Sequence, residues 1–305
     1  MQTLPDPTLV AIPYFLLSVT YEWWRIRHRK MRGTYDTKDA LTSMAMGLGS
    51  AVSGLLFGFV AAGIAYWVYS YRIQDIAFTA WSFIGLLILN DFLYYWKHRA
   101  MHRVSWFWAN HIVHHSSEYY NLTTALRQPW TGPITGLVII GAPQMWLGFH
   151  PAMVAFVGGL NLVYQFWIHT EAIDKCPRWV EAIFNTPSHH RVHHGRNARY
   201  LDANYAGILI VWDRLFGTFV PELDRDRPDY GLVTPLKSYN PFWVATHGYV
   251  DLIRTLASDS WRLWRWPLRL LAPPGWSPDG KAQTSTEFKA AYLQAHPEEC
   301  GTPGL

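Results

Sequence analysis

Residues 40–71 read ALTSMAMGLGSAVSGLLFGFVAAGIAYWVYSY, a run of apolar and small side chains with no charged residue. A helix needs about 20 such residues to cross a bilayer. The run therefore predicts either one long, tilted membrane helix or a membrane helix followed by a turn at the interface. Its small residues also predict close packing against other helices. These residues are Gly47, Gly49, Ser50, Ser53, Gly54 and Gly58.

Four other apolar stretches flank this run and predict an all-α protein. They cover residues 9–24, 76–96, 134–147 and 152–168. The last two are short and are joined by a turn at 148–151, so we expect them to dip into the bilayer rather than cross it. Only 16% of all residues are charged, against about 25% in an average soluble protein. The sequence thus predicts an integral-membrane helical bundle with about four to five membrane or membrane-dipping helices.

A basic cluster sets the expected orientation of this bundle. Arg25, Arg27, Arg29, Lys30 and Arg32 directly follow the first apolar stretch, and loops rich in Lys and Arg stay on the cytoplasmic side. Counting crossings from this loop brings the residues after 96 and after 168 to the same side. We therefore expect a cytoplasmic, histidine-rich helical cap. A basic run beside an apolar span is typical of contact with anionic lipid, so no nucleic-acid partner is expected.

Histidines with helical spacing gather on that predicted side. The chain has 14 histidines. One pair lies at i, i+4 and two triplets lie at i, i+3, i+4, which share a helix face. Each triplet is expected to aim three imidazoles at one point, and the two triplets and the pair together suffice for two metal ions. The candidate ligands are His98 and His102, then His111, His114 and His115, then His190, His193 and His194, with His169 as a ninth.

The composition of this set narrows the kind of metal site. It has no cysteine, which argues against a structural zinc finger, and it lacks the Glu-x-x-His pattern of carboxylate-bridged di-iron bundles. Imidazole suits iron, zinc and copper. Lone histidines on helices are usually ordinary surface or core residues. His28, His150, His247 and His296 are therefore left outside the predicted site.

Acidic residues near the histidines are candidates for catalytic roles or for orienting the ligands. Asp91 lies seven residues before His98, two helical turns away on the same face, and Glu118 closely follows the second set. A charge inside an apolar stretch needs a partner or a purpose. The alternative is that these acids, like Asp202 and Asp213, are solvated or support the fold.

At these histidines the sequence resembles the fatty acid hydroxylase / sterol desaturase superfamily. The resemblance is closest over residues 80–222 and rests on the segments 98–102, 111–115 and 190–194. Within the superfamily the chain is most similar to the alkylglycerol monooxygenase-like branch. This similarity rests on HHSSEYYNLTTALRQ at 114–128, NTPSHHRVHHGRN at 185–197 and the stretch 204–219.

The resemblance implies two irons held by the histidines, O₂ as co-substrate and hydroxylation of a membrane lipid, either an ether lipid or a fatty acyl chain. The implied electron donor is an electron-transfer protein or tetrahydrobiopterin. A desaturase with the same site and a non-enzymatic zinc or iron protein stay as alternatives. Candidates for binding a head group or the donor are Arg127, Gln128, Arg191 and Arg196, and charge that faces anionic lipid is the other interpretation for each.

The resemblance and the composition of the C-terminal segment together predict two parts of the chain. Residues 1–240 are expected to form the membrane fatty acid hydroxylase domain. Residues 241–305 are expected to form an interfacial amphipathic segment, rich in alternating Trp, Leu and Arg, that ends in a loose polar tail after residue 278. The chain is shorter than animal members of the branch, which favours a bacterial inner membrane with the site facing the cytoplasm. The sequence names neither the lipid, the carbon attacked nor the oligomeric state.

Overall fold

The structure is a computed structural model that describes residues 4–259, 262–280 and 282–297. These residues are helical, joined by loops that contain only isolated β-bridges and no β-strand. The N-terminal part consists of α1 (Pro7–Val10), α2 (Ile12–Arg27) and α3 (Thr37–Ser70). The expectation of an all-α fold is confirmed for the described part of the chain.

Helix α3 is continuous over 34 residues, which favours the single long helix over a helix followed by a turn. It begins where the Asp36 side chain accepts a hydrogen bond from the backbone N–H of Asp39. Among the described helices, only α3 is long and apolar enough to cross a membrane, and just 11% of its most apolar segment is buried within the protein. α2, α4 and α7 do not meet this criterion, so the number of membrane crossings expected from the sequence is not established.

The small residues of α3 divide into two groups with different surroundings. A Cβ on Gly49 would lie 2.2 Å from the indole nitrogen of Trp130, so this position has room only for glycine. The Trp130 indole N–H in turn donates to the carbonyl oxygen of Met46 at 3.1 Å. Gly54 and Gly58 have no neighbour within 4 Å in the described chain. Of the small residues predicted to pack closely, those in the first half of α3 therefore do so, and their partners lie between Leu126 and Trp130.

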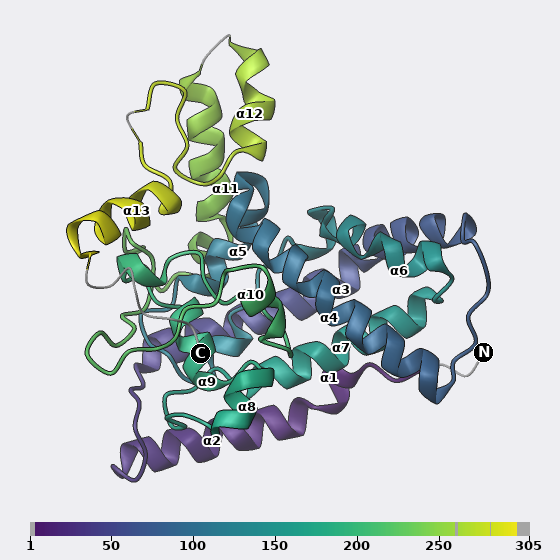
Figure 1. Ribbon diagram of the computed structural model, residues 1–305, viewed down its shortest axis with the longest axis horizontal. Coiled ribbons are helices and arrows are strands. Elements are labelled where there is room, and N and C mark those ends of the chain that lie inside the picture. Colours follow the sequence, from purple (N-terminus) through teal and green to yellow (C-terminus); the bar gives the residue numbers. More distant parts are fainter. Residues whose placement is uncertain (1–3, 260–261, 281, 298–305) are drawn as a thin grey trace.

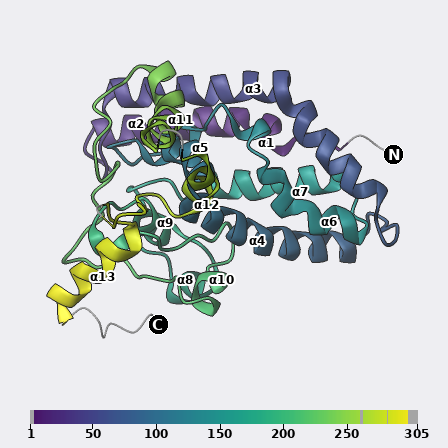
Figure 2. The same cartoon turned by 90° about the horizontal axis from the view of Figure 1, so that it is seen from above.

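The helices that follow α3 pack against one another, and some of them also pack against α3. α4 (Ala80–Arg103) starts with a capping box between Thr79 and Ser82. It packs on α7 (Pro151–Phe166) through a core of Leu86, Phe149, Met153 and Val157. In Figure 2, α7 and α6 (Ala142–Leu147) lie between α3 and α4. This arrangement carries the end of α4, with His98 and His102, back toward the loops that follow α7.

The expected helix at 134–147 is interrupted in the structure. Ile134 is the last residue of η2 (Gly132–Ile134). The residues from Leu137 onward form η3 (Leu137–Gly141) and α6. Gly136 adopts a left-handed backbone with φ 82°, and Pro143 has no N–H to continue a helical ladder. Gly136 therefore shortens the predicted helix to Leu137–Leu147, in which η3 continues directly into α6 and Pro143 lies in the first turn of α6, where its missing N–H is tolerated.

Short helices and loops complete the histidine-bearing end. α5 (Ser105–His115) follows α4 after one residue, and η1 (Thr124–Leu126) follows it. α8 (Arg178–Ile183), α9 (Pro187–His193), η4 (Ala198–Tyr200) and α10 (Val211–Leu215) come after α7. In Figure 1 this end lies opposite the turn that joins α3 and α4.

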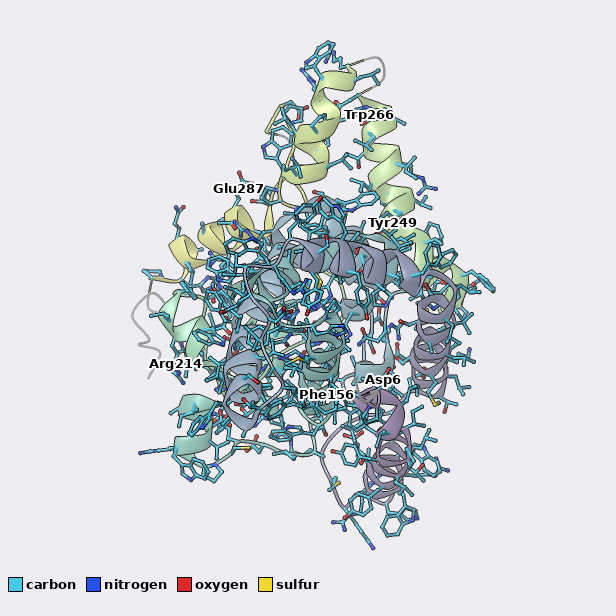
Figure 3. All side chains as sticks on the ribbon, turned by 90° about the vertical axis from the view of Figure 1, so that its right-hand side faces the viewer. Asp6, Phe156, Arg214, Tyr249, Trp266 and Glu287 are labelled. Atoms are coloured by element: carbon cyan, nitrogen blue, oxygen red, sulfur yellow. The ribbon has the colours of Figure 1, made fainter. Side chains whose placement is uncertain are left out.

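The C-terminal part contains α11 (Pro241–Ser258), η5 (Leu263–Arg265), α12 (Trp266–Leu271) and α13 (Ser285–Ala295). α11 crosses α5 closely, because a Cβ on Gly248 would lie 2.4 Å from the carbonyl oxygen of Ala109. Figures 1 and 3 show α11 and α12, which carry Tyr249 and Trp266, as a projection from the body. The expected loose tail is wrong for α13, which a capping box between Thr284 and Glu287 starts; residues 298–305 lie outside the described part.

Candidate metal centre

All nine predicted metal-binding histidines meet in the interior, and they form two groups. Within each group the candidate ligand nitrogens all lie within 4.8 Å of one another, and every member is buried. The five-histidine group consists of His98, His102, His111, His115 and His193. The four-histidine group consists of His114, His169, His190 and His194. The ninth candidate, His169, therefore lies in one of the two groups.

The two triplets are divided between the groups, which corrects the expectation that each would aim at one point. His111 and His115 enter the five-histidine group, while His114 enters the other. In the second triplet His190 and His194 share a group and His193 joins the opposite one. At about 100° per residue, i and i+4 differ by about 40° around the helix, while i+3 points about 60° to the other side. Each triplet can thus supply both groups.

The nitrogen–nitrogen distances fit ligands that converge on shared ions. The Nε2 atom of His111 lies 3.0 Å from that of His98 and 3.2 Å from that of His115. In the other group, Nε2 of His169 lies 3.2 Å from that of His114 and 3.0 Å from that of His190. Two nitrogens bound at right angles to one ion by bonds of about 2.1 Å are about 3.0 Å apart.

Backbone carbonyl groups orient several of these rings. A carbonyl oxygen only accepts hydrogen bonds, so each ring nitrogen that faces one carries the proton and leaves the other nitrogen free to coordinate. The pairs are Nδ1 of His98 with Tyr205 (2.9 Å), of His193 with Ala203 (2.9 Å), of His169 with Gln165 (2.7 Å) and of His114 with Arg127 (3.3 Å). The Nε2 atoms of His102, His193 and His194 are buried without a hydrogen-bond partner in the described chain.

Burial also sets the protonation state of the ligands. Burial, reinforced by the neighbouring His169, lowers the pKa of His114 to about 3. Burial lowers the pKa of His193 to about 3 as well. Both imidazoles are therefore neutral near pH 7, which is the form that binds metal. Buried, unpartnered and neutral nitrogens at these spacings fit a pair of metal ions, and imidazole ligands suit iron, zinc and copper.

Asp91 supports the site through a loop rather than through a histidine. Its carboxylate accepts hydrogen bonds from the backbone N–H groups of Ile208 (2.7 Å) and Leu209 (3.0 Å) and from the Trp212 indole (2.9 Å). None of its hydrogen bonds within the described residues goes to a histidine. Asp213 holds the same loop, accepting from the N–H groups of Tyr205 and Ala206, both at 2.8 Å. Together they fix the segment whose carbonyl groups orient His98 and His193.

We expect Asp91→Asn to lower the free energy of unfolding by about 2 kcal/mol and to weaken the retention of bound metal. An amide nitrogen cannot accept a hydrogen bond. In the variant, the Asn amide N–H₂ group would therefore face one of the N–H donors that now bind the Asp91 carboxylate, and both groups would be buried without an acceptor. Thermal unfolding in detergent and bound metal retained during dialysis against a chelator measure both effects. Asp75→Asn is the matched control, because Asp75 forms an exposed pair with Arg72. An Asp91→Asn protein that matches the wild type in both measurements would contradict this role.

Two of the arginines predicted to bind a head group or donor are buried and fully engaged. The Arg127 guanidinium donates to Asp39 at 2.9 Å and to Ser116 at 3.0 Å, and the backbone carbonyl of the same residue faces His114. Arg191 forms a bidentate pair with Glu222 at 3.0 and 2.6 Å. Neither side chain is exposed to a ligand in solution. Both arginines instead brace the segments that carry metal ligands.

The other three candidates lie nearer the surface. The Glu118 side chain is exposed and lies beside Gly231. Gln128 donates to the carbonyl oxygen of Ala125 at 2.8 Å, which uses its amide within its own turn. Arg196 pairs with Asp229 at 2.7 Å and borders a cavity that also reaches the histidine groups. Of the residues proposed for binding, only Arg196 borders that cavity.

Some supporting residues were not predicted from the sequence. Glu22 is buried and accepts a hydrogen bond from the backbone N–H of Leu122 at 2.8 Å. Its place inside the first apolar stretch was a usable signal, because a charge there needs a partner. The carbonyl groups of Ala203 and Tyr205 left no signal, since every residue has a carbonyl. His189, next to a predicted ligand, pairs with Glu181 at 2.9 Å and belongs to neither group.

A cavity of about 550 Å³ reaches both groups of histidines. Its wall includes His102, His115 and His193 from the five-histidine group and His194 from the other. The rest of the wall comes from α5, the loop after α9, the loop before α11, α11 itself, the loop after α12 and the start of α13. Apolar side chains make up much of it: Trp108, Ile112, Leu232, Val233, Leu236, Trp243 and Phe288. The arrangement can hold an apolar molecule against a metal centre.

Comparison with known proteins agrees with this arrangement. Residues 83–218 match the family model described as fatty acid hydroxylase. This segment contains all nine clustered histidines. The chain therefore carries a fatty acid hydroxylase domain, and the superfamily resemblance is confirmed.

Individual relatives point to the alkylglycerol monooxygenase-like branch. The chain is 37% identical over 284 residues to alkylglycerol monooxygenase of Homo sapiens, an alignment that covers 91% of this chain and 62% of that protein. Identity to the Xenopus tropicalis protein of the same name is 40% over 249 residues, covering 80% and 54% of the two chains. The Danio rerio protein is 38% identical over 298 residues, covering 91% and 61%. The chain thus spans between half and two thirds of these relatives, and no solved structure gives a significant match.

Proposed function

We propose that this chain is a membrane-bound, di-iron monooxygenase that hydroxylates an ether lipid with O₂. The observation that carries this proposal is the pair of buried histidine groups on the wall of a largely apolar cavity. Similarity to alkylglycerol monooxygenases supports the ether lipid as substrate. Family resemblance favours iron, because the donor atoms alone also suit zinc and copper.

The chemistry divides between the metals and the protein. Bound iron would activate O₂ with two electrons from a donor, so that one oxygen atom enters a C–H bond and the other leaves as water. The histidines hold the metals in a neutral shell, and the apolar wall keeps bulk water away. Hydroxylation of the carbon beside an ether oxygen gives a hemiacetal, which separates into an aldehyde and an alcohol.

Electron supply belongs to the same proposal. The donor is either an electron-transfer protein or a reduced pterin such as tetrahydrobiopterin. Arg196 offers a cationic group on the cavity wall for that donor. Rates measured with tetrahydrobiopterin alone, and with a reductase system alone, distinguish the two.

A bilayer is the proposed setting for this reaction. Leu55, Phe59 and Trp81 are 87%, 71% and 83% exposed, which suits contact with lipid chains. The basic loop after α2 lies beside the segment that follows His169, since Arg32 pairs with Asp174 at 2.7 Å. By the positive-inside rule, this proximity supports a cytoplasmic position for the histidine groups. A bacterial inner membrane fits this orientation.

Lipid analysis of a host that expresses the chain tests the proposed reaction. We expect wild-type cells to lose ether lipid and to gain the corresponding fatty aldehyde or its oxidation product. His114→Ala should abolish the change, because it removes a ligand of the four-histidine group. The control is His28→Ala, an exposed histidine outside both groups. Loss of two hydrogens without gain of oxygen would indicate a desaturase, and an unchanged lipid profile would favour a metal-binding protein without this activity.

A further inference from the structure

His247 on α11 is a buried histidine outside the two metal-binding groups. Its side chain is 2% exposed, and its Nδ1 lies 2.9 Å from the carbonyl oxygen of Val244. That carbonyl can only accept, so Nδ1 carries the ring proton and Nε2 carries a free lone pair. Nε2 is buried and has no hydrogen-bond partner in the described chain. A buried polar atom left without a partner is destabilising, which makes this histidine unusual.

The position of His247 connects it to the metal centre. It borders the same cavity as His102, His115 and His193. On α5 the cavity is bordered by Trp108, Ile112 and His115, which follow one another at helical spacing on one face. α11 crosses that helix at Gly248, the residue after His247. His247, which carries the unpartnered nitrogen, and the predicted metal ligand His115 thus lie on two walls of one cavity.

We infer that His247 is a substrate-positioning residue whose Nε2 accepts a hydrogen bond from a hydroxyl group at the polar end of the lipid. This inference rests on the proposed function and names a group that the substrate must carry. A lone pair needs a donor, and phosphate diesters and carboxylates offer none near pH 7. The charged residues on the cavity wall are Arg196, Asp202 and Asp251, and each already has an oppositely charged partner outside the wall, so the wall offers an anionic head group no unpaired cation. A glycerol with free hydroxyls and one ether-linked chain has the required chemistry.

Two lipids and three variants test the inference. The lipids are a 1-O-alkylglycerol with two free hydroxyls and the same lipid with both hydroxyls methylated. Iron-loaded protein in detergent is titrated with each under anaerobic conditions, and KM and kcat are then measured in air. We expect His247→Leu to weaken binding of the diol and raise its KM by about tenfold, the effect of one lost hydrogen bond. Binding of the dimethyl ether should not change.

His247→Gln should restore most of the diol binding, because its side-chain oxygen can take the place of Nε2. His28→Leu is the matched control and should behave as wild type. Iron content and melting temperature verify that each variant is folded. The wild type alone gives an independent test, since it should prefer the diol over the dimethyl ether.

The outcomes separate this inference from the proposed function. A wild type that oxidises ether lipid but does not distinguish the two lipids overturns the role of His247 and leaves the proposed function standing. Equal losses for both lipids in His247→Leu also overturn it, because they indicate packing rather than hydrogen bonding. A wild type that oxidises neither lipid overturns the proposed function and the inference together.

Discussion

Replacing His193 with alanine should abolish lipid oxidation and lower the bound iron from about two ions to about one per chain. His193 belongs to the five-histidine group, is buried, and is oriented by the carbonyl oxygen of Ala203. Loss of even a group that orients a metal ligand costs about 10–100-fold in metal affinity or activity, so loss of a ligand should exceed about 100-fold. Iron content after anaerobic reconstitution and lipid-dependent O₂ consumption give the two readouts.

The matched control for this variant lies on the same helix. His189→Ala removes an imidazole that pairs with Glu181 and enters neither group. We expect this control to keep both irons and most of the activity. It tests whether membership of a group matters more than the local density of histidines. Normal iron and full activity in His193→Ala would remove the assignment of the five-histidine group.

Glu222→Ala should be strongly destabilising, although Glu222 is not one of the histidines of the metal centre. Glu222 is the bidentate partner of Arg191, a residue of α9 that lies between His190 and His193. Removing one partner of a buried ion pair leaves an uncompensated charge and costs about 3–5 kcal/mol. At about 2–4 °C per kcal/mol, we expect the melting temperature to fall by about 10 °C.

Loss of metal should accompany this change. Arg191 also donates to the carbonyl groups of Thr170 and Ile173, at 3.0 and 2.6 Å, in the segment that follows His169. The variant should therefore lose iron first from the four-histidine group. Asp229→Ala is the control, because the pair between Arg196 and Asp229 is partly exposed and contributes little. Similar melting temperatures for Glu222→Ala and Asp229→Ala would contradict the bracing role.

The sequence predicted which histidines would come together but not how they divide into two groups. Helical spacing identified eight of the nine histidines, because side chains on adjacent turns leave a regular pattern, and the ninth, His169, was marked only by its place directly after the apolar stretch 152–168. The division of each triplet between two groups depends on how α5 and α9 face one another across the site. That relation is a property of packing between distant segments, and no local pattern records it.

The roles of the charged residues were harder to predict for a related reason. Asp91 was correctly marked as unusual inside an apolar stretch, but its partners are backbone N–H groups more than 100 residues further along the chain. The prediction that Arg127 and Arg191 bind a ligand was wrong, because their guanidinium groups are paired with the buried carboxylates of Asp39 and Glu222. A sequence shows charge, and only the fold shows whether that charge is already neutralised.

Secondary structure could be predicted where local composition alone determines it. The long apolar run became one helix, since composition and length decide such a segment locally. The stretch 134–147 was apolar enough for a helix, yet the left-handed backbone at Gly136 shortens that helix to Leu137–Leu147. The Thr284 and Glu287 pair is the sequence pattern of a capping box and could have predicted the start of α13. The polar composition of the segment instead led to the prediction of a loose tail.

Anomalous X-ray diffraction on either side of the iron absorption edge, from protein reconstituted anaerobically with ferrous iron, tests the central claim most directly. Reconstitution is required because imidazole ligands bind zinc more tightly than ferrous iron. We predict two iron peaks per chain, one among His98, His102, His111, His115 and His193 and the other among His114, His169, His190 and His194. A single peak, or iron bound away from these histidines, would contradict the account.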